Sequence, residues 1–223
     1  MKSLYNLLVM DPPYGFQDTL SMSDVKRGAQ ANYSTMTNKE LLSLPIKELA
    51  DPDWSVLALW CPSSLLDFGL ELMKEYSFDF KQIWIWCKIK NDPFKKMKKL
   101  NKKGKLDFDN VNWNDFLSFG MGHLARNMHE VVLIGTKGKV YKELKNRSQR
   151  TVFFAPNEKH SKKPEILQDK LELMFNGNNV KKIEVFARRQ RLGWTTIGNQ
   201  NPSTINEDIR ISLSKLVNYS VIK

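Results

Sequence analysis

The sequence predicts an α/β fold in which helices flank a mainly parallel sheet. Short apolar runs alternate with stretches of helical periodicity, which is the pattern of strands joined by crossover helices. Hydrophobic residues make up 41% of the 223 residues, enough for a packed core. The length suits one sizeable domain and no linker divides the chain, so we predict a single domain over residues 1–223.

The first half of the chain is expected to supply three strands and two helices. The apolar run over 5–10 predicts a buried strand that ends at Asp11. Thr37 and Glu40 form a capping box for a short helix, and Ser63 is placed to cap an amphipathic helix. The other two predicted strands are 55–60 and 80–89, and the second contains Trp84 and Trp86, which we interpret as core residues.

The second half is expected to supply three more strands and two helices. Pro164 suits the first position of a helix over about 164–174. Thr204 and Glu207 form a second capping box, which predicts a helix over about 205–216. The predicted strands are 129–135, 182–186 and 195–198.

A lysine-rich segment over about 91–114 interrupts this pattern. It has almost no apolar support, so we expect an exposed, flexible loop within the domain. The segment is either a solvated insertion or a clamp for nucleic acid phosphates, and the pattern leaves both open. The lysines that we assign to phosphate contact are Lys95, Lys96, Lys98 and Lys99.

The composition favours a polyanionic partner. The net charge is +11 with a pI near 9.5, which makes nucleic acid the first candidate, the alternative being a generally basic surface. No signal peptide or membrane-length apolar run is present, so we expect a cytoplasmic protein without a membrane partner. Cys61 and Cys87 lie in apolar runs as expected of free thiols, and no Cys/His pattern predicts a metal site.

The tetrapeptide Asp11-Pro12-Pro13-Tyr14 follows the first predicted strand. In open α/β sheets, ligands bind at the carboxyl ends of strands. A carboxylate and a backbone carbonyl can both accept hydrogen bonds from an exocyclic amino group, and a tyrosine ring can stack on its base. The alternative is an ordinary turn, because Asp and Pro are common turn residues.

Further blocks follow this tetrapeptide in a fixed order, from about Tyr5 to Gln200, and the whole series resembles the MT-A70 family of adenine N6-methyltransferases. The blocks after the tetrapeptide are Tyr33-Ser34-Thr35-Met36, Leu59-Trp60-Cys61, Trp86-Cys87-Lys88, Asn127-Met128-His129-Glu130, Ile134-Gly135-Thr136-Lys137-Gly138, His160-Ser161-Lys162-Lys163-Pro164, Glu184-Val185-Phe186-Ala187-Arg188, Gly193-Trp194 and Gly198-Asn199-Gln200.

The resemblance implies a Rossmann-like, S-adenosylmethionine-dependent methyltransferase fold in permuted order, with the catalytic motif first and the cofactor-binding strand last. It implies methyl transfer from S-adenosylmethionine to the N6 amine of adenine, in DNA of a bacterial or phage-infected cell. The small size and the lack of an appended RNA-binding module favour DNA. The alternatives are an RNA adenine N6-methyltransferase, a non-catalytic nucleic-acid-binding subunit and cytosine N4 methylation. Because family members often work as dimers, a homodimer or heterodimer is also considered.

The resemblance also implies roles for single residues. Asp11 and the Pro12 carbonyl hold the target amine within the Asp11-Pro12-Pro13-Tyr14 motif, and Tyr14 stacks on the base. Tyr33 and Glu130 line the pocket on the substrate side. The residues implied to bind the cofactor are Asp11, Lys163, Glu184, Arg188, Asn199 and Gln200.

Two departures from the family pattern accompany these roles. Tyr14 stands where the mRNA enzyme of the family has tryptophan. That enzyme also has a segment ahead of its catalytic strand that contacts the cofactor adenine, whereas ten residues precede Asp11 in this sequence. The adenine contact must therefore come from elsewhere or be absent.

Overall fold

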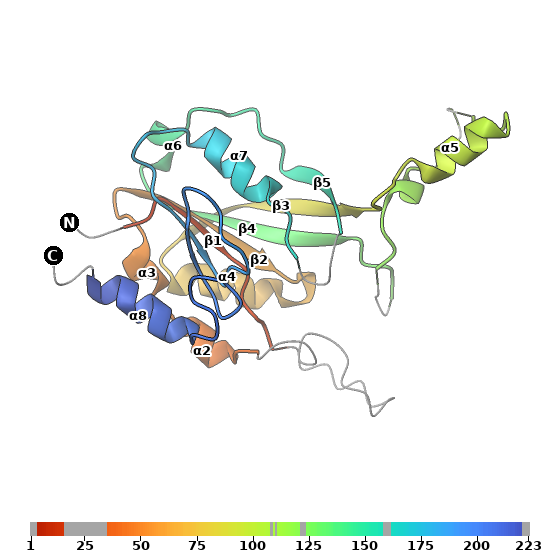
Figure 1. The fold of residues 1–223 in the computed structure, drawn as a ribbon. Coiled ribbons are helices and arrows are strands. Elements are labelled where there is room, and N and C mark those ends of the chain that lie inside the picture. Colours follow the sequence, from red (N-terminus) through yellow and green to blue (C-terminus); the bar gives the residue numbers. More distant parts are fainter. Residues whose placement is uncertain are drawn as a thin grey trace, which may run out of the picture.

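A seven-stranded sheet with helices on both faces forms the body of the computed structural model (Figure 1). The structure describes residues 4–15, 35–107, 109, 111–120, 124–157 and 162–219. The strands are β1 (Leu7–Met10), β2 (Trp54–Cys61), β3 (Asp79–Ile89), β4 (His129–Gly138), β5 (Val152–Pro156), β6 (Lys182–Val185) and β7 (Thr195–Ile197). The helices are α2 (Asn38–Leu42), α3 (Ile46–Leu49), α4 (Leu66–Glu75), α5 (Lys95–Lys102), α6 (Val140–Glu143), α7 (Ile166–Met174) and α8 (Ile209–Tyr219), with 3-10 turns at Ser63–Leu65 and Trp113–Phe116.

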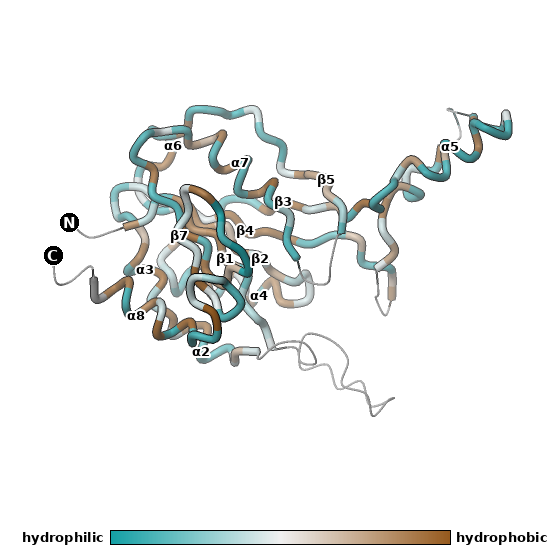
Figure 2. The backbone as a smooth tube through the Cα atoms, viewed as in Figure 1, coloured by the Kyte–Doolittle hydropathy of each residue, from teal (hydrophilic) through white to brown (hydrophobic). Residues whose placement is uncertain are grey.

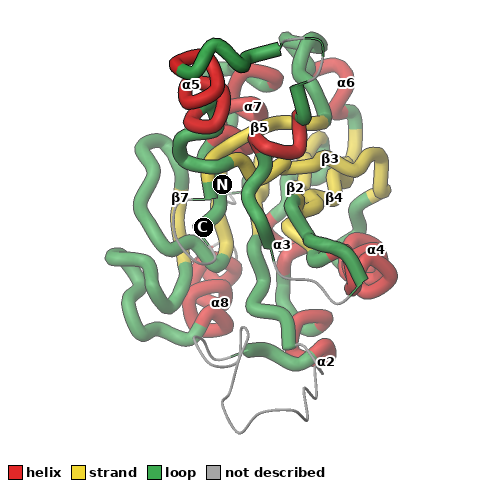
Figure 3. Tube along the Cα trace, turned by 90° about the vertical axis from the view of Figure 1, so that its right-hand side faces the viewer, coloured by secondary structure: helices red, strands yellow, loops and turns green. Residues whose placement is uncertain are grey.

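The strand order is β5-β3-β4-β2-β1-β6-β7, and β4 alone among these strands runs antiparallel to its neighbours. The predicted α/β fold with a mainly parallel sheet is therefore confirmed. β1 lies between β2 and β6, with Met10 paired to Leu59 on one side and to Val185 on the other. The carboxyl ends of six strands and the start of β4 consequently meet at one edge of the sheet. Loops lie over this edge in Figure 3.

Two apolar clusters, one on each face, hold the helices to the sheet. On one face, α4 and α8 place Leu72 and Leu213 against β1, β2 and β4. On the other face, α7 places Leu167 and Leu171 against a layer that includes Trp84 and Trp86. Both tryptophans are buried, so their predicted place in the core is confirmed.

Helix starts were predicted with mixed success. The capping box of Thr37 and Glu40 is formed, since each side chain accepts a hydrogen bond from the other residue's backbone. Ser63 does not cap α4, because it begins a 3-10 turn and the helix starts at Leu66 without a side-chain cap. α7 starts at Ile166, two residues after Pro164.

The second predicted capping box is absent from the described structure. α8 starts at Ile209, four residues later than expected. The Thr204 hydroxyl instead accepts from the Gly198 amide and donates to the Gly198 carbonyl, while Glu207 accepts from Ser212 and pairs with Lys215 on α8. A tertiary contact with the turn after β7 thus outweighs the local cap.

The lysine-rich segment contains a helix where a loop was expected. Lys95–Lys102 form α5, which stands away from the sheet (Figure 1) and is largely hydrophilic (Figure 2). Lysine is a good helix former, and two nearby acids reduce the charge repulsion. Lys96 pairs with Asp115 at 2.6 Å, and Lys98 pairs with Asp92 at 3.3 Å.

Besides α5, sequence reasoning also missed α3, α6 and β5. α3 and α6 have four residues each, too few to show helical periodicity. β5 is an edge strand in which Phe153 and Ala155 are buried while Phe154 is exposed.

No helix within the described residues is long and apolar enough to cross a membrane.

We expect Leu133→Ala to lower the free energy of unfolding by about 2–5 kcal/mol, because it opens a cavity in a fully buried position on β4. Urea denaturation followed by circular dichroism measures this change. Leu192→Ala, at a side chain that is 98% exposed, is the matched control and should change stability by less than about 0.5 kcal/mol. Equal effects of the two substitutions would contradict the assigned core.

Candidate active site

The turn after β1 is fixed by hydrogen bonds at three points. The backbone N–H of Tyr14 donates to the Pro12 carbonyl at 2.9 Å, and the N–H of Met36 donates to the Pro13 carbonyl at 2.9 Å. The Tyr14 hydroxyl donates to the Trp60 carbonyl at 2.8 Å. The turn therefore holds the Asp11 side chain at a defined place beside the ends of β2 and β6.

Tyr14 is packed more deeply than a freely presented stacking ring. Its side chain is 4% exposed and lies edge-on to Phe68, with the ring centroids 6.3 Å apart. It still lines the larger of the two cavities described below. In this conformation, the ring can contact a ligand only along the small part that borders that cavity.

Lys163 lies between two carboxylates from different parts of the chain. Its Nζ is 3.1 Å from Asp11 Oδ1 and 2.9 Å from Glu130 Oε2. Lys88 Nζ lies 2.5 Å from the other Glu130 oxygen, Oε1. The four side chains form the charge cluster Asp11–Lys163–Glu130–Lys88, in which positive and negative groups alternate. Their exposed fractions are only 16–26%, so the pairing acts where water screens it weakly.

The cluster shifts the titration of its members in different directions. Burial raises the pKa of Asp11; Lys163 offsets part of this effect and Glu130 adds to it. Burial alone would raise the pKa of Glu130, but Lys163 and Lys88 together outweigh it and lower that pKa. Burial alone would lower the pKa of Lys163, yet Asp11 and Glu130 raise it. Lys163 and Glu130 are thus both charged at neutral pH.

Two adjoining cavities meet at the turn after β1, residues 11–14. The larger encloses ≈ 860 Å³ and the smaller ≈ 260 Å³. Both are lined by Asp11, Pro13, Thr35 and Arg188. Ligands in the two cavities would therefore approach each other at Asp11.

The structure brings most of the predicted site residues to these cavities. Tyr14, Glu130 and Lys163 line the larger one, together with Pro12. Asn199 and Gln200 line the smaller one. Arg188 lies at the junction.

Two groups of predicted residues lie away from both cavities, and Tyr33 is not placed. Glu184 lines neither cavity; its carboxylate accepts a hydrogen bond at 3.0 Å from Gln168 on α7. Tyr33 falls outside the described residues. The lysines assigned to phosphate contact are on α5 and border neither cavity: Lys95, Lys96, Lys98 and Lys99.

Lys88 is a site residue that sequence reasoning did not assign. Trp86 pairs with Glu130 in the β3–β4 register, and Lys88 lies on the same face of β3 two residues later. Diagonal neighbours on one face are within reach of long side chains. Lys88 belongs to the block Trp86-Cys87-Lys88 of the family resemblance, but only the strand pairing shows that it lies next to Glu130.

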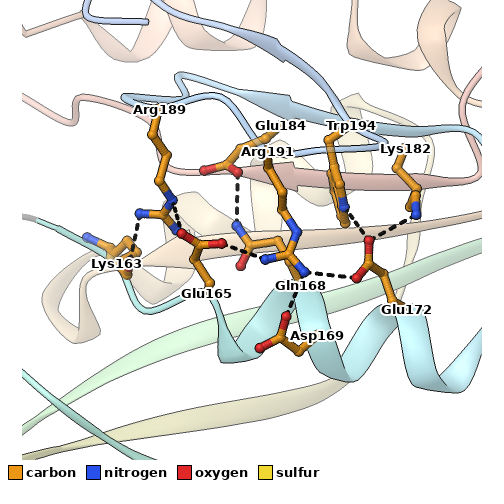
Figure 4. Close-up of polar contacts among 10 residues, drawn as sticks. All are labelled: Lys163, Glu165, Gln168, Asp169, Glu172, Lys182, Glu184, Arg189, Arg191 and Trp194. Carbon is orange, nitrogen blue, oxygen red and sulfur yellow. Dashed lines mark hydrogen bonds and ion pairs between the residues drawn. The ribbon is translucent and has the colours of Figure 1, made fainter.

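An ion-pair network holds the segment that carries Lys163 (Figure 4). Arg189 donates to the Lys163 carbonyl at 3.2 Å, and its Nε lies 2.7 Å from Glu165. Arg191 binds Glu165 as well, at 2.6 Å. The same guanidinium also contacts two acids of α7, Asp169 and Glu172. The turn after β6 is thus tied to the start of α7.

The arrangement offers charged and amide groups for a zwitterionic ligand and a nucleoside. A carboxylate and an ammonium group lie side by side, and the exposed residues Asn199 and Gln200 line the smaller cavity. Within the described ranges, no group of three His, Cys, Asp or Glu side chains could hold a metal ion.

Comparison with known proteins gives a family and a relative. The MT-A70 family model matches residues 5–200. The Type II methyltransferase M.MunI of Mycoplasma sp is 24% identical over 213 residues, an alignment that covers 89% of this chain and 78% of that protein.

We expect Glu130→Gln to lower the free energy of unfolding at pH 7 by about 1–3 kcal/mol, because it removes a charge-assisted partner of Lys163 and Lys88. The pKa of Glu130 is lower in the folded than in the unfolded protein. Its contribution is therefore present above the unfolded pKa, near 4.3, and is lost as pH falls through the folded value.

Urea unfolding at pH 7, 5, 4 and 3 measures this dependence. The gap between wild type and Glu130→Gln should shrink as the pH decreases. Glu48→Gln, at an exposed position of α3, is the control and should leave stability nearly unchanged. A gap that stays constant down to pH 3 would rule out an ionised Glu130 as its source.

Proposed function

Because this chain belongs to the MT-A70 family and is a methyltransferase, we propose that it transfers a methyl group from S-adenosylmethionine to the N6 amine of adenine in DNA. The observation that carries the proposal is the meeting of two cavities at Asp11. A transferase with two substrates needs them side by side at the reacting atoms. The smaller cavity would take the cofactor nucleoside and the larger one the target base.

The side chains around the junction fit the cofactor. S-adenosylmethionine carries an ammonium, a carboxylate, a ribose and an adenine, and it supplies a methyl group on a positively charged sulfur. Asp11 can accept from the ammonium, and Lys163 can bind the carboxylate. Arg188, Asn199 and Gln200 can bind the nucleoside part. A lysine ammonium has three N–H donors, of which two are directed to Asp11 and Glu130, leaving one.

The catalytic turn is suited to hold an amino group. The N6 lone pair of adenine is delocalised into the ring, so the amine is a poor nucleophile. Asp11 and the Pro12 carbonyl would accept its two hydrogens and direct the nitrogen toward the methyl group. Pro12 already accepts one hydrogen bond, from Tyr14, but a carbonyl oxygen has two lone pairs. Positioning of this kind is worth roughly 7–11 kcal/mol over a free encounter.

Several observations support a nucleic acid as the methyl acceptor. The chain carries a net charge of +11, and α5 displays lysines at the same edge of the sheet as the catalytic turn (Figure 1). The similarity to a Type II methyltransferase supports DNA over RNA. In a duplex, the base must be flipped out at a cost of a few kcal/mol. Contact with Tyr14 would offset part of that cost.

Two alternatives remain to be separated from DNA methylation. RNA methylation would use the same groups on the same base. A non-catalytic subunit would not need an acid held at the junction of two cavities, so the Asp11–Lys163 pair favours an active enzyme. The permuted motif order, the cytoplasmic location and the possible dimer stay predictions.

We expect Asp11→Ala to lower the rate of methyl transfer by on the order of 10²–10³-fold, because the amine loses its charged acceptor. The measurement is transfer of labelled methyl from S-adenosylmethionine to duplex DNA, single-stranded DNA or RNA, followed by identification of the labelled base. Label at N6 of adenine in DNA is the expected result.

Asp67→Ala, at an exposed acid of α4, is the matched control and should keep the full rate. Circular dichroism checks that Asp11→Ala is folded, as expected because Lys163 keeps Glu130 as a partner. A near-normal rate in Asp11→Ala would contradict the mechanism. Failure of wild type to label any polymer while it binds the cofactor would contradict the enzyme assignment.

Replacing Lys95, Lys96, Lys98 and Lys99 by Gln should weaken DNA binding and flatten its salt dependence, because each lost phosphate contact lowers the slope of log K against log salt by roughly 0.9. Fluorescence anisotropy with labelled duplex DNA at several salt concentrations measures the slope. The control replaces four other exposed lysines that lie outside α5, namely Lys47, Lys74, Lys142 and Lys145. An equal slope in both variants would show that α5 has no special role.

A further inference from the structure

The smaller cavity extends beyond the residues that the family resemblance assigns. Apart from the four residues shared with the larger cavity and Asn199 and Gln200, its wall comes from α2 and the residue two positions before it, the turn after β6 and the start of α8. The residues of this unassigned wall are Met36, Glu40, Phe186, Asp208, Ile209 and Arg210. A ligand that fills this cavity would contact Asp11 with one end and the unassigned wall with the other.

The wall combines apolar side chains with two carboxylates. Met36, Phe186 and Ile209 supply the apolar part. Asp208 and Glu40 are hydrogen-bond acceptors, and interactions with neighbouring N–H and O–H groups lower the pKa of both. A flat ring with an exocyclic amino group matches this combination, because the amine donates to a carboxylate and the ring faces contact the apolar side chains.

Arg210 fixes the Asp208 carboxylate in place. Its backbone N–H donates to Oδ1 at 2.8 Å, its Nε to the same oxygen at 2.9 Å, and its terminal nitrogen to Oδ2 at 2.5 Å. A second terminal nitrogen donates to Glu40 at 3.2 Å, which links α8 to α2. The Nε–H also lies 3.2 Å from Oδ2, so the three N–H groups make four contacts with the carboxylate. The Asp208 side chain is nevertheless 39% exposed and lines the smaller cavity, so a ligand there can reach its oxygens.

Phe186 is held at the cavity in an unusual backbone conformation. Its φ is +66°, which is uncommon for a residue with a side chain. Next to it, a Cβ on Gly198 would lie 2.4 Å from the Ala187 carbonyl oxygen, so the turns after β6 and β7 pack backbone against backbone. A strained backbone conformation like that of Phe186 often occurs where a protein binds a ligand, and the packing around it maintains the strain.

We propose that Asp208 selects the base of the cofactor: it accepts a hydrogen bond from the 6-amino group of adenine, whose ring packs between Phe186 and Ile209. This inference rests on the proposed function, which brings S-adenosylmethionine to the smaller cavity. It assigns the adenine contact that the family resemblance leaves open. Ile209 and Leu213 anchor α8 in the core, and Asp208 is the residue directly before this helix.

The test compares two probes that differ at one position of the base. S-adenosylhomocysteine carries the 6-amino group, whereas S-inosylhomocysteine has a carbonyl oxygen there, which a carboxylate repels. Isothermal titration calorimetry gives the Kd of both for wild type and variants. Wild type should bind the adenosyl compound at least about 10-fold more tightly.

Asp208→Asn gives the sharpest prediction, because its amide can donate to the carbonyl of the inosyl compound. This variant should bind S-inosylhomocysteine several-fold more tightly than wild type does, a gain that misfolding cannot produce. Asp208→Ala should weaken adenosyl binding about 10-fold and abolish discrimination. Glu207→Ala is the matched control, because this neighbouring acid contacts Ser212 and Lys215 and borders neither cavity.

The outcomes separate the two proposals. If wild type binds S-adenosylhomocysteine and Asp208→Ala binds both compounds as wild type does, the role of Asp208 is overturned while the cofactor assignment stands. If wild type binds neither compound, the proposed function itself is overturned.

Discussion

The candidate site depends on one buried ammonium group, that of Lys163. It pairs with Asp11 after β1 and with Glu130 at the start of β4, while Lys163 itself precedes α7. Transferring an unpaired charge into such a place costs several kcal/mol. Each charge in the cluster therefore needs an opposite charge beside it. Lys163 alone cannot balance the two negative charges of Asp11 and Glu130, and Lys88 supplies the second positive charge. The site forms only when β1, β3, β4 and the segment before α7 are in place together.

The strand directions explain why these charges can meet. Six strands point their carboxyl ends to the same edge, and β4, which runs the other way, brings its first residues to that edge. The ion pairs of Arg189 and Arg191 then fix the turn after β6 against α7. The two cavities share Asp11, and their walls combine the ends of strands with loops, α2 and the start of α8. A methyl donor and a methyl acceptor need this kind of geometry.

Sequence rules correctly predicted features that depend on contacts between residues close together in the chain. The Thr37 capping box formed because both partners lie within four residues. The box at Thr204 failed because Gly198, which is close only in the folded chain, engages the same hydroxyl. The lysine-rich segment was expected to be a loop, but nearby acids such as Asp115 offset its charge and α5 forms. The predicted cofactor contact of Glu184 stays a prediction; its carboxylate accepts a hydrogen bond from Gln168 on α7, which only the folded chain brings near.

The sequence by itself determined the α/β class, the core tryptophans, the membership of the MT-A70 family and the turn that follows the first strand, because hydrophobic periodicity and motif order are written along the chain. Only the tertiary structure decided which side chains share the site. Lys88 joins Glu130 through strand pairing, and Asp208 reaches the smaller cavity because α8 packs beside α2 and α3. Such contacts depend on distances between residues far apart in sequence, and no local pattern records them.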